Sequence, residues 1–248
     1  MDIQNNPAGR LLDILQLAMQ QQDNAKLRSV WATVCGVPDS DTSAVLDVLA
    51  DVIKLSNEAK AALEAVDQTE DKIFVEPFKN IEPFFSEINL ENPWHVYKKR
   101  LTEATLKGLR YGAYELSRQS PYKVVKATDL EALQSDLSSL MDKVTDSDLP
   151  PELKSAIFRR LEGVHHSLRL FSVNGPEGLQ EAIDSVVGAL VMHSAQIAAS
   201  ASRDSGPLIQ DMWTYLQRAA TLITLAVYGN AAFQHVEKGM QALMSHNP

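Results

Sequence analysis

Cysteine is almost absent from the sequence, since Cys35 is the single one among 248 residues. One thiol cannot form a disulfide within the chain or complete a four-cysteine zinc site, so nothing points to an oxidising compartment. The first ten residues lack the apolar run of a secretory signal. The most apolar stretch, residues 219–233, falls short of the roughly 20 residues that span a bilayer. We therefore expect a cytoplasmic protein without a stable membrane span.

The common sequence motifs of catalysis are missing as well. There is no Walker glycine loop, no dinucleotide fingerprint, no zinc-protease helix and no nucleophile elbow. His235 and Glu237 match the start of a zinc-deaminase motif, but one cysteine cannot supply the cysteine pair that this motif needs. Glu162 and His165 form one Glu-x-x-His step, whereas a di-iron bundle needs two. The sequence therefore predicts no metal and no cofactor, and it favours a non-enzymatic protein over an enzyme.

Apolar residues recur every three to four positions along most of the chain, which indicates helices that pack on one another. The sequence predicts an all-α, multi-helix bundle with about nine or ten helices. Its clearest part is an antiparallel helical hairpin over residues 128–173, in which Pro150 and Pro151 separate the two helices. Thr128 and Glu131 form a capping box at the start of this hairpin. The seam of the first helix has a mean step of about 3.5 residues and contains Leu130, Leu133, Leu137, Leu140 and Val144.

Prolines indicate how the chain is divided. Three prolines and four phenylalanines fall within residues 71–93. Since proline disfavours a long helix, we expect this Pro/Phe-rich segment to be a connector. It would join an N-terminal helical part, residues 1–70, to a C-terminal helical bundle, residues 94–248.

Positive charge is scarce but locally concentrated. The chain has 23 Lys or Arg against 32 Asp or Glu, a net charge of −9, yet residues 94–126 carry a net charge of +6. On the predicted helix at 102–118, helical spacing places cations and two tyrosines opposite the apolar stripe. Such a face fits an acidic protein surface, phosphates and bases, or no partner at all. We predict a docking patch for a protein, with nucleic acid less favoured; its residues are Lys98, Lys99, Arg100, Lys107, Arg110, Tyr111, Tyr114 and Arg118.

A second pattern lies in residues 159–166, which read Arg-Arg-Leu-Glu-Gly-Val-His-His. Four residues separate Arg160 from His165. This spacing resembles the arginine–histidine motif of the HEPN family, which are helical ribonucleases that dimerise and cleave RNA without a metal. The resemblance implies an alternative function, in which His165 acts as general acid or base and Arg160 stabilises the charge on the phosphate.

The last predicted helix, residues 208–243, has little polar surface. We expect it to be a core helix or to carry a homo-oligomer interface. A membrane-active effector that uses residues 208–233 is a further alternative.

Short stretches such as Asn6-Pro7-Ala8 and Glu76-Pro77-Phe78 are similar to bacterial proteins found in mobile-element or defence gene neighbourhoods. The resemblance implies a bacterial setting and no particular activity. Because catalytic motifs are missing, the leading hypothesis is a non-enzymatic helical interaction, adaptor or regulatory protein of a bacterial cytoplasm.

Overall fold

The structure is a computed structural model that describes residues 5–119, 124–193, 196 and 205–227. Within these residues it contains ten helices and no strand, so the all-α prediction is confirmed. The chain forms two compact units, which are residues 4–122 and, in the main, residues 123–248. We call them the N-terminal unit and the C-terminal unit. None of the described helices is long and apolar enough to cross a membrane.

The N-terminal unit is built around helix α1 (Pro7–Met19). Helices α2 (Leu27–Cys35), α3 (Thr42–Val66) and α6 (Glu103–Gln119) all pack against α1. The side chain of Asn6 caps α1, because its Oδ1 accepts a hydrogen bond from the Gly9 amide at 2.7 Å. The Nδ2 of the same residue donates to Ser117 Oγ at 2.8 Å. One buried asparagine therefore starts α1 and attaches the end of α6 to it.

The Pro/Phe-rich segment belongs to the core of this unit. It forms α4 (Phe78–Ser86) and leads into the short helix α5 (His95–Lys98). The ring of Phe84 is buried and packs edge-on against Trp31 and Trp94, with ring centroids 6.3 and 5.8 Å apart. Aromatic pairs in this geometry are stabilising beyond the area that they bury. The segment therefore fastens α2 to the rest of the unit.

The structure consequently divides the chain later than the sequence predicts. Residues 71–93 lie inside the N-terminal unit and do not connect two parts. Helix α6, which was predicted to open the C-terminal bundle, packs against α1 and α3 instead. The prolines do not mark a connector, because they lie in and between short elements of one core. Pro83, for example, lies inside α4.

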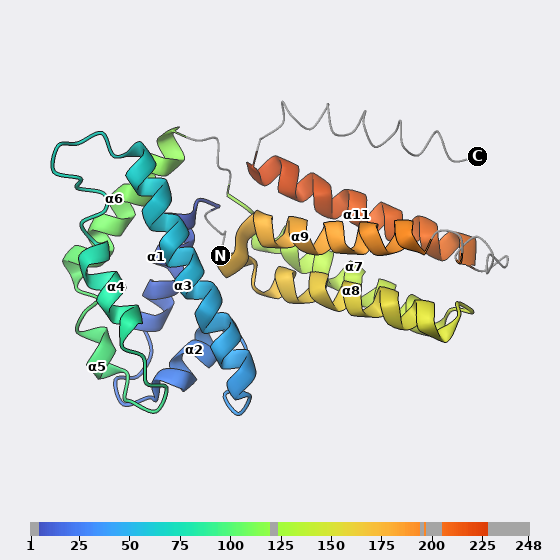
Figure 1. Cartoon of the computed structure of the whole chain (residues 1–248), viewed down its shortest axis with the longest axis horizontal. Helices are drawn as coiled ribbons and strands as arrows, with labels where there is room; N and C mark the ends of the chain where they lie inside the picture. Colours follow the sequence, from blue (N-terminus) through green and yellow to red (C-terminus); the bar gives the residue numbers. More distant parts are fainter. Residues whose placement is uncertain (1–4, 120–123, 194–195, 197–204, 228–248) are drawn as a thin grey trace. The chain divides into compact units, whose positions relative to one another are not determined.

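The C-terminal unit contains α7 (Ala127–Asp146), α8 (Pro151–Arg169), α9 (Phe171–Met192) and α11 (Ser205–Val227). Contacts run from α7 to α8, from α8 to α9, from α9 to α11 and from α11 back to α7, which makes a four-helix bundle (Figure 1). Every residue of the predicted seam in α7 is buried in this core. The predicted hairpin is therefore confirmed. Its second helix ends earlier than predicted, at Arg169, and the backbone turns at Gly175, where φ is 65°.

Candidate functional site

Five of the predicted docking residues share the outer side of α6. The opposite side of this helix is buried and includes Leu109, Ala113 and Leu116. Since a helix turns about 100° per residue, the five side chains project away from the core. All five are exposed: Lys107, Arg110, Tyr111, Tyr114 and Arg118. We call these residues the α6 outer face.

Two glycines determine how closely α6 lies against the rest of the unit. A Cβ at Gly112 would stand 2.8 Å from Cδ2 of Leu63, and a Cβ at Gly108 would stand 2.8 Å from Cγ of Pro77. Both distances are too short for ordinary van der Waals contact. Both glycines therefore allow side chains of other segments to pack closely against α6. The close fit keeps the inner side of α6 buried and its outer side facing solvent.

The aromatic part of the α6 outer face is strongly exposed. Tyr111 has 57% of its surface exposed and Tyr114 has 70%. Among the described aromatic side chains, these two are the most exposed. They lie three positions apart, so both rings stand on one side of the helix. We refer to them as the tyrosine pair. Neither ring is buried in the core of the described chain.

The charged part of the α6 outer face has two cations that are free to bind. Arg118 is occupied, because its Nε and Nη2 donate to the Glu115 carboxylate at 2.9 and 2.6 Å. These bonds, with one from Gln119, lower the pKa of Glu115 to about 2, so the carboxylate stays ionised and paired. Lys107 and Arg110 have neither a hydrogen bond nor an ion pair with any described residue. We call Lys107 and Arg110 the free cations.

Two of the three predicted docking cations at positions 98–100 are already paired within the chain. Lys98 forms an ion pair with Asp23, with Nζ and Oδ1 2.8 Å apart, and the hydrogen bond lowers the pKa of Asp23. Arg100 pairs with Glu87 at 2.7 Å and also donates to the carbonyl of Pro83. Lys99 alone is exposed without a partner in the described part of the chain. The structure thus gives Lys98 and Arg100 the role of attaching loops.

The residues of the alternative ribonuclease reading lie on α8. Arg160 and His165 are both exposed. Five positions of α-helix place them about 140° apart around the axis, with the buried seam between them. The helix therefore does not bring the two side chains to one point. Within the described residues, no group of three or more His, Cys, Asp or Glu could hold a metal ion.

The apolar stripe of residues 208–227 lies in the core of the C-terminal bundle, where Met212, Leu216 and Ala219 are buried. The part of the predicted self-association helix beyond residue 227 lies outside the described residues. Self-association through residues 208–243 stays a prediction.

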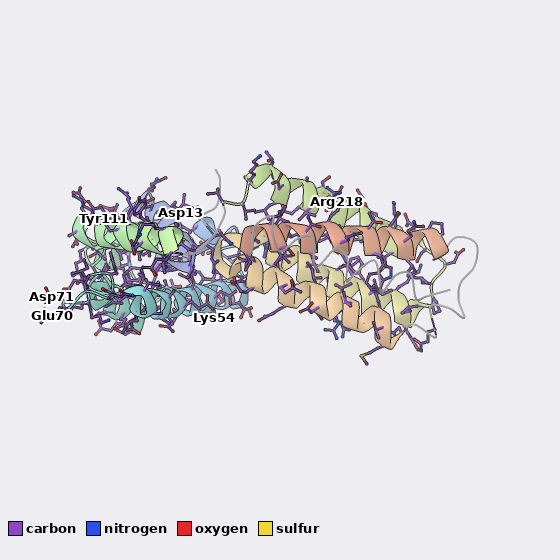
Figure 2. All side chains as sticks on the ribbon, turned by 90° about the horizontal axis from the view of Figure 1, so that it is seen from above. Asp13, Lys54, Glu70, Asp71, Tyr111 and Arg218 are labelled. Carbon is purple, nitrogen blue, oxygen red and sulfur yellow. The ribbon has the colours of Figure 1, made fainter. Side chains whose placement is uncertain are left out.

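The surface between α7 and α11 has a feature that the sequence reading missed. Lys143 pairs with Asp211 at 2.6 Å, and Arg218, which Figure 2 labels, pairs with Asp136. The two pairs border a hollow of about 180 Å³. Burial of Tyr215 at this hollow raises the pKa of its hydroxyl, so the hydroxyl stays protonated. Because each cation already holds a carboxylate, this feature offers no free charge.

No family model, no curated protein and no solved structure matches this chain. Among the described residues, the α6 outer face brings strongly exposed aromatic rings together with unpaired cations.

Proposed function

We propose that the chain is a non-enzymatic interaction protein that docks an acidic protein surface on the α6 outer face. The observation that carries this proposal is the tyrosine pair, 57% and 70% exposed, beside two cations that pair with no described carboxylate. Tyrosine and arginine are the residues that most often dominate binding energy in protein interfaces, where a ring fills a pocket and excludes water from nearby charges.

The charge of the α6 outer face favours a carboxylate-bearing partner over a nucleic acid. Free cations steer an acidic surface towards them and set the register of the complex. A long polyanion would also meet the net negative charge of the chain as a whole, which is −9. A protein partner needs complementarity only over the local patch.

Affinity capture from cells that produce the chain tests this proposal. The full chain would be compared with a face variant, Lys107→Glu with Arg110→Glu, and with a second face variant, Tyr111→Ser with Tyr114→Ser. The matched control is Arg159→Glu with Arg160→Glu, which reverses two exposed arginines on α8 of the other unit. Both proteins and nucleic acids in the captured material would be identified.

We expect both face variants to lose the same acidic protein, and we expect the α8 control to retain it. Truncation of an interface residue that dominates binding costs about 2 kcal/mol or more, a loss of roughly thirtyfold or greater. If both face variants retain every captured protein, the proposal is wrong. If RNA or DNA is the only component lost, the face binds nucleic acid and the proposal is also wrong.

A further inference from the structure

The loop between α3 and α4 is held in one conformation by Asp67. This buried carboxylate accepts hydrogen bonds from the amides of Phe74 at 2.8 Å and Thr69 at 3.1 Å. The amide of Ile73 in turn donates to Thr69 Oγ1 at 3.1 Å. Lys72 takes a φ of 50°, and its amine donates to the Asp67 carbonyl. We call residues 67–76 the acidic loop, and its backbone is fixed by its own hydrogen bonds.

The acidic loop presents one strongly exposed apolar side chain and two unpaired carboxylates to solvent, while a third exposed carboxylate, that of Glu76, pairs with Lys79 at 2.6 Å. Ile73 has 51% of its surface exposed. Glu70 and Asp71 are exposed, and neither has a hydrogen bond or an ion pair with a described residue. Figure 2 shows Glu70 and Asp71 at one end of the N-terminal unit, whereas Tyr111 lies on its side. The loop and the α6 outer face are therefore two separate surfaces of the same unit.

These two surfaces complement each other in kind and in number. The loop offers an exposed isoleucine with two unpaired anions, and the α6 outer face offers the tyrosine pair with two unpaired cations. We infer that the acidic loop of one copy docks on the α6 outer face of a second copy. Ile73 lies against the tyrosine pair, and Glu70 and Asp71 face the free cations. This inference rests on the proposed function, because it names the partner of the same face.

The small buried surface and the fixed loop backbone are consistent with a weak but specific contact. A loop tip buries less surface than a large permanent interface, so we expect a contact weaker than that of an obligate oligomer. The fixed loop backbone reduces the entropy that docking would otherwise cost. Because the two surfaces differ, the contact is head-to-tail and leaves a free loop and a free face on each dimer. Copies therefore add in sequence as the concentration rises.

Sedimentation velocity of the full chain, from 10 µM to about 1 mM, tests the inference. The loop variant is Ile73→Asp, and the face variant is Tyr111→Ser with Tyr114→Ser. A matched control is Leu46→Asp on α3, because Leu46 is 50% exposed in the same unit and lies outside both surfaces. The circular dichroism spectrum of each variant should equal that of the unaltered chain, since every altered side chain is exposed.

We expect the unaltered chain and the Leu46→Asp control to associate with rising concentration. The loop variant and the face variant should each associate at least about tenfold more weakly. An equal mixture of these two variants should form dimers and nothing larger, because one supplies only the face and the other only the loop.

Three results overturn the inference: a chain that stays monomeric at about 1 mM, a mixture that does not pair, or a Leu46→Asp variant that no longer associates. The proposed function survives the first result if the face variants still lose an acidic protein in the capture experiment. It fails separately if those variants lose nothing.

Discussion

The two units of the chain reach stable cores by different means. In the C-terminal unit, four helices bury leucine-rich seams along their length, and the connection between α7 and α8 is short. In the N-terminal unit, α1 is surrounded by helices of unequal length, and aromatic rings and buried polar groups such as Asn6 and Asp67 fix the segments between them. The regular bundle needs few specific contacts outside its seam. The irregular unit needs many, and these contacts hold a loop and a helix face in set positions where a partner can meet them.

The largest expected effects are losses of stability that core substitutions cause in one unit at a time. Phe84→Ala removes a buried ring that packs against Trp31 and Trp94, and it should lower the free energy of unfolding of the N-terminal unit by about 3–5 kcal/mol. Its counterpart Leu137→Ala should lower that of the C-terminal unit by about 2–5 kcal/mol, since Leu137 is fully buried. Hydrogen exchange read by mass spectrometry should show lost protection only in the unit that carries the substitution. Equal loss in both units would show that they unfold as one.

The next effect concerns the buried carboxylate of the acidic loop. In Asp67→Asn, an amide group replaces one carboxylate oxygen and leaves a backbone donor of the loop without an acceptor. This should destabilise the N-terminal unit by about 1–3 kcal/mol. No comparable buried carboxylate occurs in the described part of the C-terminal unit. Urea unfolding measures the difference, followed by tryptophan fluorescence in a Trp213→Phe background so that only Trp31 and Trp94 of the N-terminal unit contribute.

The same residue gives the N-terminal unit a pH dependence. Burial disfavours the charged form of Asp67, but hydrogen bonds from Thr69 and Phe74 more than offset burial, so its pKa is lowered in the folded chain. The unfolded chain binds the proton more readily, with a pKa of about 3.9. The stabilisation by Asp67 is therefore complete above about pH 4 and is lost as the pH falls through the lower folded value. Asp67→Asn should flatten this decline, and an unchanged decline would assign it to other carboxylates.

Replacing one glycine by alanine in each unit should change stability by a smaller amount, with opposite signs in the two units. Gly112→Ala places a methyl group 2.8 Å from a Leu63 methyl, which should cost about 1–3 kcal/mol against a gain in helix propensity of about 1 kcal/mol. Gly163→Ala on α8 meets nothing within 4 Å, so only the gain remains. Thermal unfolding should show a lower midpoint for the first variant and a higher one for the second. A stabilising Gly112→Ala would mean that α6 lies less closely against α3.

The smallest effect tests the charged contact between α7 and α11. Lys143 and Asp211 are both about half exposed, so their ion pair should stabilise the bundle by only about 0.2–1 kcal/mol. A double-mutant cycle with Lys143→Ala and Asp211→Ala measures this coupling directly. A coupling well above this range would indicate that the pair, and not the apolar seam, sets the position of α11.

Much of the fold could be predicted because the seams repeat regularly. The hairpin of α7 and α8 follows from leucines that recur every three to four residues. Local signals were less reliable than this period. The capping box of Thr128 and Glu131 was wrong, because α7 begins at Ala127 and no side chain caps it. Packing of the seam evidently decides where this helix begins more strongly than a local hydrogen bond would.

The candidate site could be predicted only where its residues lie on one helix. The five residues of the α6 outer face share one helix, so periodicity alone brings them together. The partners of Lys98 and Arg100 come from distant segments, at Asp23 and Glu87, and no local pattern reveals such pairs. The acidic loop was missed because its structure depends on one buried residue, Asp67, whose role is visible only when the backbone has turned around it. The sequence signal for this loop was Ile73, an apolar residue close to the acidic residues Glu70 and Asp71.

Photo-crosslinking between copies tests the docking of the acidic loop on α6 most directly. A benzophenone amino acid would replace Tyr114 in the full chain, and equal amounts of nitrogen-15-labelled and unlabelled chain would be irradiated together at high concentration. Our account predicts crosslinked peptides of mixed isotope content that join position 114 of one copy to residues 67–76 of the other. Mixed crosslinks to other segments, or crosslinks within single copies alone, would contradict it.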